Sequence, residues 1–196
     1  MDNKTLSYYE VNKDQFKNTT QTLDFSKYQD LFLSYLNPKS SILDFGCGAG
    51  RDTKYFLNKG YKVDALDGSP QMCEIASNYC KIDVKNILFE DFNEVEKYDG
   101  IWACSSILHV PYNNLSDIFL SLNKALKNNG ILYVSFKYGS FEGYKNGRYF
   151  TNLTLERFLD IPYISKGFSI EKHFITSDVR KNRENEKWLN IIMRKE

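Results

Sequence analysis

The chain has 196 residues, 42% of them hydrophobic and 26% charged, which suits one soluble α/β domain with its own core. Its formal net charge of +1 lacks the basic bias of proteins that grip phosphates, which argues against a nucleic-acid substrate. The four cysteines show no CxxC spacing, so we expect no metal site. No segment looks like a membrane span or a signal peptide, so we expect a cytoplasmic protein with free cysteines.

The first 37 residues are predicted to form a lid or accessory helices, ahead of a core over residues 38–196 of the same domain. Residues 1–24 are polar and aromatic and have no strong apolar period. From Phe25 to Leu36 apolar side chains recur at helical spacing, and Pro38 ends this helix.

From residue 40 onward, short apolar runs alternate with helical stretches. A helix from Leu115 to Leu126 carries one apolar stripe, and Asn129-Gly130 is its predicted stop. The first five apolar runs are separated by helices, as in a parallel βαβ series, and the last two follow each other and should pair antiparallel. The predicted strands are Ser41–Phe45, Tyr61–Asp67, Asn86–Phe89, Gly100–Cys104, Gly130–Phe136, Ser169–Ser177 and Trp188–Arg194. This pattern predicts a Rossmann-like α/β fold: a seven-stranded, mostly parallel sheet with helices on both faces and an antiparallel last strand.

The most informative stretch is the glycine loop Gly46-Cys47-Gly48-Ala49-Gly50, which follows the first apolar strand and opens a helix. Glycines permit a tight turn and close approach of a ligand to the backbone. Asp67 ends the second strand, about 20 residues later, where a carboxylate in nucleotide-binding βαβ units accepts hydrogen bonds from ribose hydroxyls. The loop and the carboxylate together predict a cofactor site.

Two cofactors compete for this site. Dinucleotides favour the pattern G-x-G-x-x-G, whereas this loop reads G-x-G-x-G and is preceded by Asp44. An acidic residue repels a pyrophosphate but suits a cationic ligand, and S-adenosylmethionine carries both a sulfonium and an ammonium. S-adenosylmethionine is therefore favoured, and a NAD-dependent oxidoreductase stays as the alternative from another class.

Five segments in order resemble the class I S-adenosylmethionine-dependent methyltransferases, and the start of the chain, Tyr8-Tyr9 with Phe16 and Thr19, resembles their small-molecule members, in which an N-terminal segment folds over the cofactor. The segments are Leu43–Arg51, Val63–Ser69, Phe89–Phe92, Tyr98–Cys104 and Leu126–Leu132. One departure is Asn128-Asn129-Gly130, where the family usually has proline and glycine, and it affects only a turn. The resemblance implies a methyltransferase that acts on a small polar molecule.

The resemblance also implies roles for particular residues. Asp44 and the glycine loop would cradle the methionine portion of the cofactor, Asp67 would hold the ribose, and Asp91 would meet the adenine amino group. The implied cofactor-binding residues are Tyr9, Asp44, Gly46, Cys47, Gly48, Gly50, Arg51, Asp67, Gly68, Ser69, Met72, Asp91, Phe92, Cys104 and Ser105.

Methyl transfer needs positioning of the nucleophile, and it needs a base only when the accepting atom must lose a proton. His109, just after the fourth strand, is the best placed candidate base, and a structural histidine is the competing interpretation. Cys104 is a weaker candidate, because nothing nearby in sequence marks it as a thiolate.

The acceptor is predicted to bind between the loops that follow the fifth and sixth strands, since ligands sit beyond the carboxyl ends of parallel strands. These loops bring cationic and aromatic side chains to one mouth, and three glycines would let the first loop move as a lid. The candidate residues are Lys137, Tyr144, Arg148, Arg180, Arg183 and Trp188. The alternative is a solvated surface on which Arg180 and Arg183 pair with Glu184 and Glu186, and a tRNA or protein acceptor also stays open.

Overall fold

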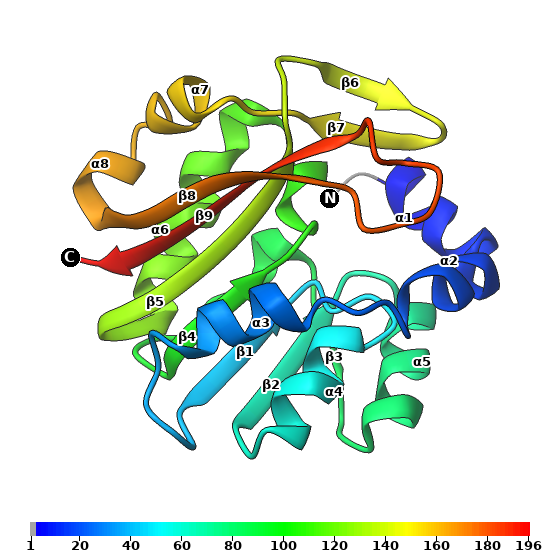
Figure 1. Cartoon of the computed structure of the whole chain (residues 1–196), viewed down its shortest axis with the longest axis horizontal. Helices are drawn as coiled ribbons and strands as arrows, with labels where there is room; N and C mark the ends of the chain where they lie inside the picture. Colours follow the sequence, from blue (N-terminus) through cyan, green and yellow to red (C-terminus); the bar gives the residue numbers. More distant parts are fainter. Residues whose placement is uncertain (1–2) are drawn as a thin grey trace.

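A seven-stranded sheet forms the centre of the molecule in the computed structural model, which describes residues 3–196 (Figure 1). The strand order is β3-β2-β1-β4-β5-β9-β8. The strands from β1 to β5 run parallel, and β9 is antiparallel to both β5 and β8. The strands are β1 (Ser41–Phe45), β2 (Lys62–Asp67), β3 (Lys85–Asn86), β4 (Tyr98–Ala103), β5 (Leu126–Lys137), β8 (Phe168–Ser177) and β9 (Lys187–Lys195). The predicted fold class is confirmed, and six of the seven predicted strands are found close to their predicted bounds. The third was predicted at Asn86–Phe89, but β3 is only Lys85–Asn86, and Phe89 begins a 3₁₀ turn.

Helices cover both faces of this sheet, because alternate residues of each strand point to opposite sides. On one face Ile42 packs in a buried cluster with Phe32 and Phe56, and on the other Leu43 packs with Phe119 and Phe158. The first face is covered by α3 (Ser26–Leu33), α4 (Arg51–Asn58) and α5 (Pro70–Cys80). The second is covered by α6 (Leu115–Ala125), α7 (Leu155–Leu159) and α8 (Ile164–Gly167).

The end of α6 differs from the prediction. The helix ends at Ala125, and Leu126 already pairs with Tyr98 of β4. Asn129 adopts a left-handed backbone with φ of 61° inside a register shift between Leu126 and Ile131. The Asn-Gly dipeptide therefore forms an irregularity within β5 instead of a helix stop.

The segment after β5 was predicted as an open loop, but it forms a hairpin of β6 (Glu142–Lys145) and β7 (Arg148–Thr151). Asn146 and Gly147 make its two-residue turn, with φ of 50° and 81°. Positive φ at both central residues is the geometry of a type I′ turn, which matches the twist of paired strands.

The N-terminal region forms two short helices, α1 (Asn3–Val11) and α2 (Lys13–Thr20). Met1 and Asp2, which belong to the predicted lid, lie outside the described residues. The buried hydroxyl of Thr5 accepts from the backbone N–H of Tyr149 at 3.0 Å. The side chain of Gln21 donates to the carbonyl of Ala49 at 2.8 Å. These contacts fix the segment to the β6–β7 hairpin and to the glycine loop.

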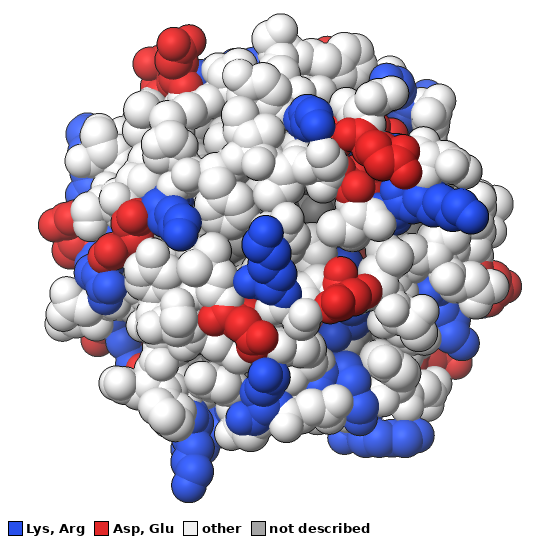
Figure 2. Space-filling model, viewed as in Figure 1, with Lys and Arg blue, Asp and Glu red and all other residues white. Residues whose placement is uncertain are grey.

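Three 3₁₀ turns complete the fold: η1 (Phe89–Asp91), η2 (Ile107–His109) and η3 (Tyr112–Asn114). Within residues 3–196, no helix has the length and apolar character that a bilayer crossing requires. On the face seen in Figure 2, basic and acidic side chains are intermixed and form no continuous patch of one sign.

Candidate active site

A cavity opens at the carboxyl ends of β1 and β4, the two neighbouring strands from which the chain proceeds to opposite sides of the sheet. Ligands of open α/β sheets bind at this kind of switch point. The cavity contains about 1290 Å³ of empty space, its open mouth included. Its walls come from the loops after β1, β2, β4 and β5, from α1 and α2, and from the segment between β8 and β9.

The glycine loop forms the floor of the cavity. Gly46 has a φ of 85°, and a Cβ there would lie 2.4 Å from the Cβ of Ser106, so any side chain is excluded. Ser106 lines the cavity, and its buried hydroxyl has no hydrogen-bond partner within residues 3–196. Buried hydroxyls are normally paired, which leaves this one available to a bound ligand.

Asp67 presents its carboxylate at the end of β2. One oxygen accepts from the backbone N–H of Gly48 and the other from that of Ser69, both at 2.9 Å. Burial raises the pKa of this carboxyl above its usual value. The hydroxyl of Ser69 caps α5 by accepting from the N–H of Met72 at 3.4 Å, which fixes the turn that positions Asp67.

The structure brings nine of the fifteen predicted cofactor residues to the cavity wall. These are Tyr9, Gly46, Cys47, Gly48, Arg51, Asp67, Met72, Cys104 and Ser105. Six others do not line it: Asp44, Gly50, Gly68, Ser69, Asp91 and Phe92.

Asp44 is buried behind the glycine loop and accepts a hydrogen bond from the hydroxyl of Thr53 at 2.5 Å. Burial, with the nearby carboxylate of Asp52, raises the pKa of Asp44 to about 8. The structure thus gives Asp44 a role inside the core, away from the position predicted for contact with the methionine portion.

The aromatic wall after β3 is Phe89, not Phe92. Phe89 lines the cavity and stacks on Phe45 with ring centroids 4.5 Å apart, whereas Phe92 packs edge-on against Phe45 from within the core. Asp91 is exposed. The 3₁₀ turn η1 rotates this segment, and no residue in the sequence signals such a turn.

Arg51 is held in place by a buried network. It donates two hydrogen bonds of 2.8 Å to Asp52, which also accepts from Trp102 at 2.9 Å. Near it, burial raises the pKa of the Cys104 thiol to about 12. This thiol stays protonated at neutral pH, which agrees with the view that it is not a nucleophile.

His109 lines the cavity with its ring orientation fixed on both sides. Its Nδ1 lies 2.6 Å from the carbonyl oxygen of Tyr149, and a carbonyl can only accept, so Nδ1 carries the hydrogen. In the neutral ring Nε2 is then the acceptor, and the hydroxyl of Tyr9 donates to it at 2.8 Å. Burial raises the pKa of Tyr9, which keeps this hydroxyl protonated.

Five of the six predicted acceptor residues line the same cavity: Lys137, Arg148, Arg180, Arg183 and Trp188. Tyr144 does not; it is 51% exposed and its ring lies against Tyr149.

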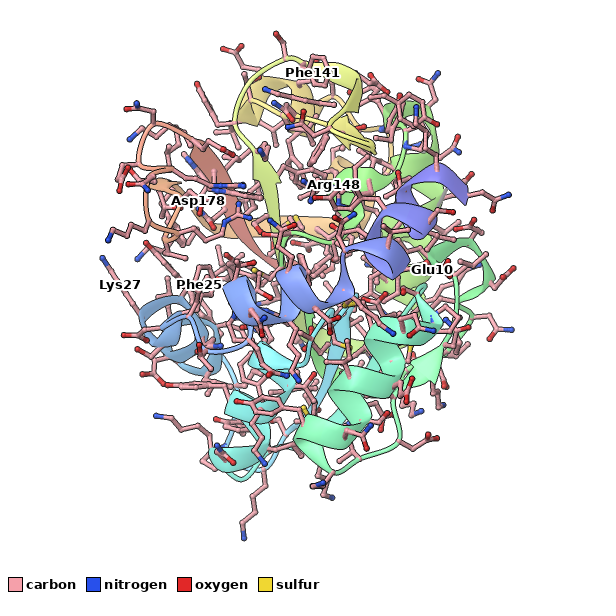
Figure 3. All side chains as sticks on the ribbon, turned by 90° about the vertical axis from the view of Figure 1, so that its right-hand side faces the viewer. Glu10, Phe25, Lys27, Phe141, Arg148 and Asp178 are labelled. Atoms are coloured by element: carbon pink, nitrogen blue, oxygen red, sulfur yellow. The ribbon has the colours of Figure 1, made fainter. Side chains whose placement is uncertain are left out.

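Asp178, which the sequence did not mark, organises the acceptor side of the cavity. Its carboxylate accepts from both Arg180, through two side-chain nitrogens, and the indole of Trp188. Arg180 therefore pairs with Asp178 instead of Glu184 or Glu186, while Arg183 approaches Glu186 at 3.8 Å. Figure 3 shows Asp178 on its loop and Arg148 between the hairpin and α1.

Comparison with known proteins adds to this geometry. A family model described as "Methyltransferase domain" matches residues 42–130. An uncharacterized methyltransferase of Staphylococcus carnosus is 29% identical over 143 residues, covering 65% of this chain and 69% of that protein. A ubiquinone biosynthesis O-methyltransferase of Rickettsia conorii is 27% identical over 140 residues, covering 69% of this chain but only 47%, about half, of that protein.

The solved structure of the Burkholderia thailandensis 1,6-didemethyltoxoflavin-N1-methyltransferase, with 1,6-didemethyltoxoflavin and S-adenosylhomocysteine bound, shares the fold with a TM-score of 0.76. It is 18% identical, and the match covers 97% of this chain and 84% of the other. Residues 42–130 are therefore identified as a methyltransferase domain. Its cofactor is S-adenosylmethionine, and the NAD alternative is set aside.

The cavity of this methyltransferase fits that cofactor on its own chemistry. It offers a glycine floor without side chains, the carboxylate of Asp67 for hydroxyl groups, and the unpartnered hydroxyl of Ser106. Met72 and Phe89 add apolar walls beside Asp67.

Proposed function

We propose that this methyltransferase acts on a small polar molecule, which it binds in the same cavity as its cofactor. The observation that carries the proposal is the continuity of the cavity from Asp67 and the glycine loop to Lys137, Arg148 and Trp188. One side of this cavity is therefore available to the cofactor and the other to an acceptor.

Two features favour a small acceptor over a tRNA or a protein. Helices α1 and α2 contact both the glycine loop and the hairpin, so they cover the cavity in the manner of a lid. The net charge of +1 provides no broad basic surface of the kind that nucleic-acid binding requires.

In this proposal Asp67 accepts hydrogen bonds from the ribose hydroxyls, and the backbone of Gly46–Gly48 lies along the methionine portion. Tyr9 and Phe16 close the site from the lid. When bound, S-adenosylmethionine supplies an electrophilic methyl carbon on a sulfonium. The residues of the chain orient the acceptor toward that carbon and exclude water.

His109 is the proposed general base for an acceptor that must lose a proton. Its bond to the Tyr149 carbonyl leaves the lone pair of Nε2 facing Tyr9. Nε2 would accept the proton that the acceptor loses, either directly or through the hydroxyl of Tyr9. The competing role for His109 is structural, namely to hold the lid through Tyr9.

The experiment that tests the proposal is a screen of a low-mass metabolite extract with an isotopically labelled methyl donor. We expect the label to appear in a small molecule, and to appear only when the wild-type protein is present. Transfer of label to protein or RNA alone, or no transfer by a protein that binds S-adenosylhomocysteine, would contradict it.

A further inference from the structure

Arg148 differs from the other cations of the cavity. Five lysine or arginine side chains line it, and within residues 3–196 Arg148 is the one without a carboxylate partner. The other four are paired: Arg51 with Asp52, Lys137 and Arg183 with Glu186, and Arg180 with Asp178. Arg148 is therefore the cation of the cavity wall whose charge no neighbouring carboxylate offsets.

Aromatic rings hold the guanidinium of Arg148. Its carbon lies 4.4 Å from the ring centroid of Tyr8, 5.1 Å from that of Phe150 and 5.7 Å from that of Tyr9. Gly147 allows the Tyr8 ring to lie close to the hairpin beside Arg148. It has a φ of 81°, and a Cβ at this position would lie 2.9 Å from the Tyr8 ring. Cation–π contacts of this kind position the group without satisfying its N–H donors.

Most of those donors lack an acceptor. The one side-chain hydrogen bond of Arg148 within residues 3–196 is a long one of 3.5 Å to the hydroxyl of Tyr9. Its Nε is buried and has no hydrogen-bond partner among the residues that the structure describes. A guanidinium carries five N–H donors in a planar fork that matches a carboxylate or a phosphate.

We propose that Arg148 is an oxyanion subsite, so that the methyl acceptor of this protein carries a carboxylate or a phosphate group. The inference rests on the proposed function, which it makes more specific. The hydroxyl of Tyr9 contacts both Arg148, at 3.5 Å, and Nε2 of His109, at 2.8 Å. An acceptor of a few atoms can therefore place its anionic group on Arg148 and its nucleophile beside His109.

The test measures anion binding directly and does not depend on methyl transfer. Protein saturated with S-adenosylhomocysteine is titrated with inorganic phosphate and, separately, with acetate, each at an ionic strength held constant with chloride. We expect one of the two anions to bind the wild type at one site, and Arg148→Ala to weaken that binding by about tenfold or more. The tighter of the two anions indicates whether the acceptor is a phosphate ester or a carboxylate.

Arg194→Ala is the matched control. Arg194 pairs with Glu171 and lies beside Ile131, toward the amino end of β5 and away from the carboxyl ends of the strands where the cavity opens. This variant should bind both anions as the wild type does. If neither anion binds the wild type above chloride, or if Arg148→Ala binds as tightly as the wild type, the inference is overturned.

Because Arg148 also contacts Tyr8 of the lid, the affinity for S-adenosylhomocysteine is measured in every variant. If Arg148→Ala loses that affinity, Arg148→Lys and Arg148→Gln replace it in the anion titration. Arg148→Lys should bind the anion severalfold more tightly than Arg148→Gln, and equal binding would overturn the inference. Failure of the proposed function would be seen in a different experiment. In that case no small molecule would accept the label in the screen, whatever the result of the anion titrations.

Discussion

Asp67 is the residue on which cofactor binding depends most in this account. Its two oxygens already accept hydrogen bonds from backbone N–H groups, so the carboxylate is held at the cavity wall before any ligand arrives. We expect Asp67→Ala to weaken binding of S-adenosylhomocysteine by ~1.5–3 kcal/mol, the range for hydrogen bonds to a charged group. Calorimetry measures this, with Asp83→Ala, at an exposed position, as the control. Unchanged affinity in a folded Asp67→Ala protein would show that the ribose lies elsewhere.

His109 and Tyr9 lead to a second expectation at the residue scale. If Nε2 removes a proton, His109→Asn should lower kcat by about 10²–10⁴-fold while the affinity for S-adenosylhomocysteine changes little. Tyr9→Phe, which keeps the ring and removes the hydroxyl, is the companion variant. Steady-state kinetics on the acceptor found by the labelling screen provides the measurement. A purely structural histidine predicts the opposite pattern, with weaker cofactor binding and a nearly unchanged kcat.

Asp44 makes stability depend on pH. Its pKa is about 8 in the folded protein against an ordinary value of 3.8, so between these values the folded state holds a proton that the unfolded state releases. The free energy of unfolding should therefore fall as pH rises through this window. Asp44→Asn keeps an oxygen for Thr53 and cannot ionise. The melting temperature of Asp44→Asn minus that of the wild type should increase as the pH is raised from about 5 to about 8. A difference that does not change with pH would contradict the raised pKa of Asp44.

Sequence reasoning located Asp67 because its signal is local: a strand end at a fixed distance from a glycine loop. It placed Phe92 in the site instead of Phe89, because the 3₁₀ turn η1 depends on packing against Phe45. It also missed Asp178, whose partners Arg180 and Trp188 are brought to it by the fold of the segment between β8 and β9. Patterns along the chain do not encode contacts of that kind.

At the scale of elements, the lid consists of α1 and α2. The ring of Phe16 on α2 lies over Gly48, where a Cβ would be 3.0 Å away, and it contacts Tyr9 edge-on. We expect Phe16→Ala to weaken binding of S-adenosylhomocysteine by about 1–2 kcal/mol, through lost aromatic contact and easier entry of water. Lys17→Ala, on the same helix and exposed, is the matched control. Equal affinities of the two variants would show that α2 does not close the site.

The elements also differ in how well the sequence predicted them. The strands emerged from apolar runs because the parallel sheet is buried on both faces. The hairpin was missed although Asn146-Gly147 is a strong turn signal, because three glycines made the segment look like a mobile loop. The end of α6 was placed too late, because the pairing of Leu126 with β4 overrides its fit to the helical stripe.

At the scale of the whole molecule, the site is assembled from distant parts of the chain at the carboxyl ends of the central strands. The strand order places β1 beside β4, so Gly46 and Ser106 approach each other across the switch point. The lid reaches from the glycine loop to the hairpin and joins the proposed cofactor side to the proposed acceptor side through Tyr9. Cofactor and acceptor should therefore share a single cavity.

A crystal structure of the protein with S-adenosylhomocysteine bound tests this expectation most directly. The account predicts that the ribose hydroxyls contact Asp67, that the sulfur points toward His109, and that the space beside Arg148 stays open for an acceptor. A ligand that binds away from Asp67, or one that fills the space beside Arg148, would contradict it.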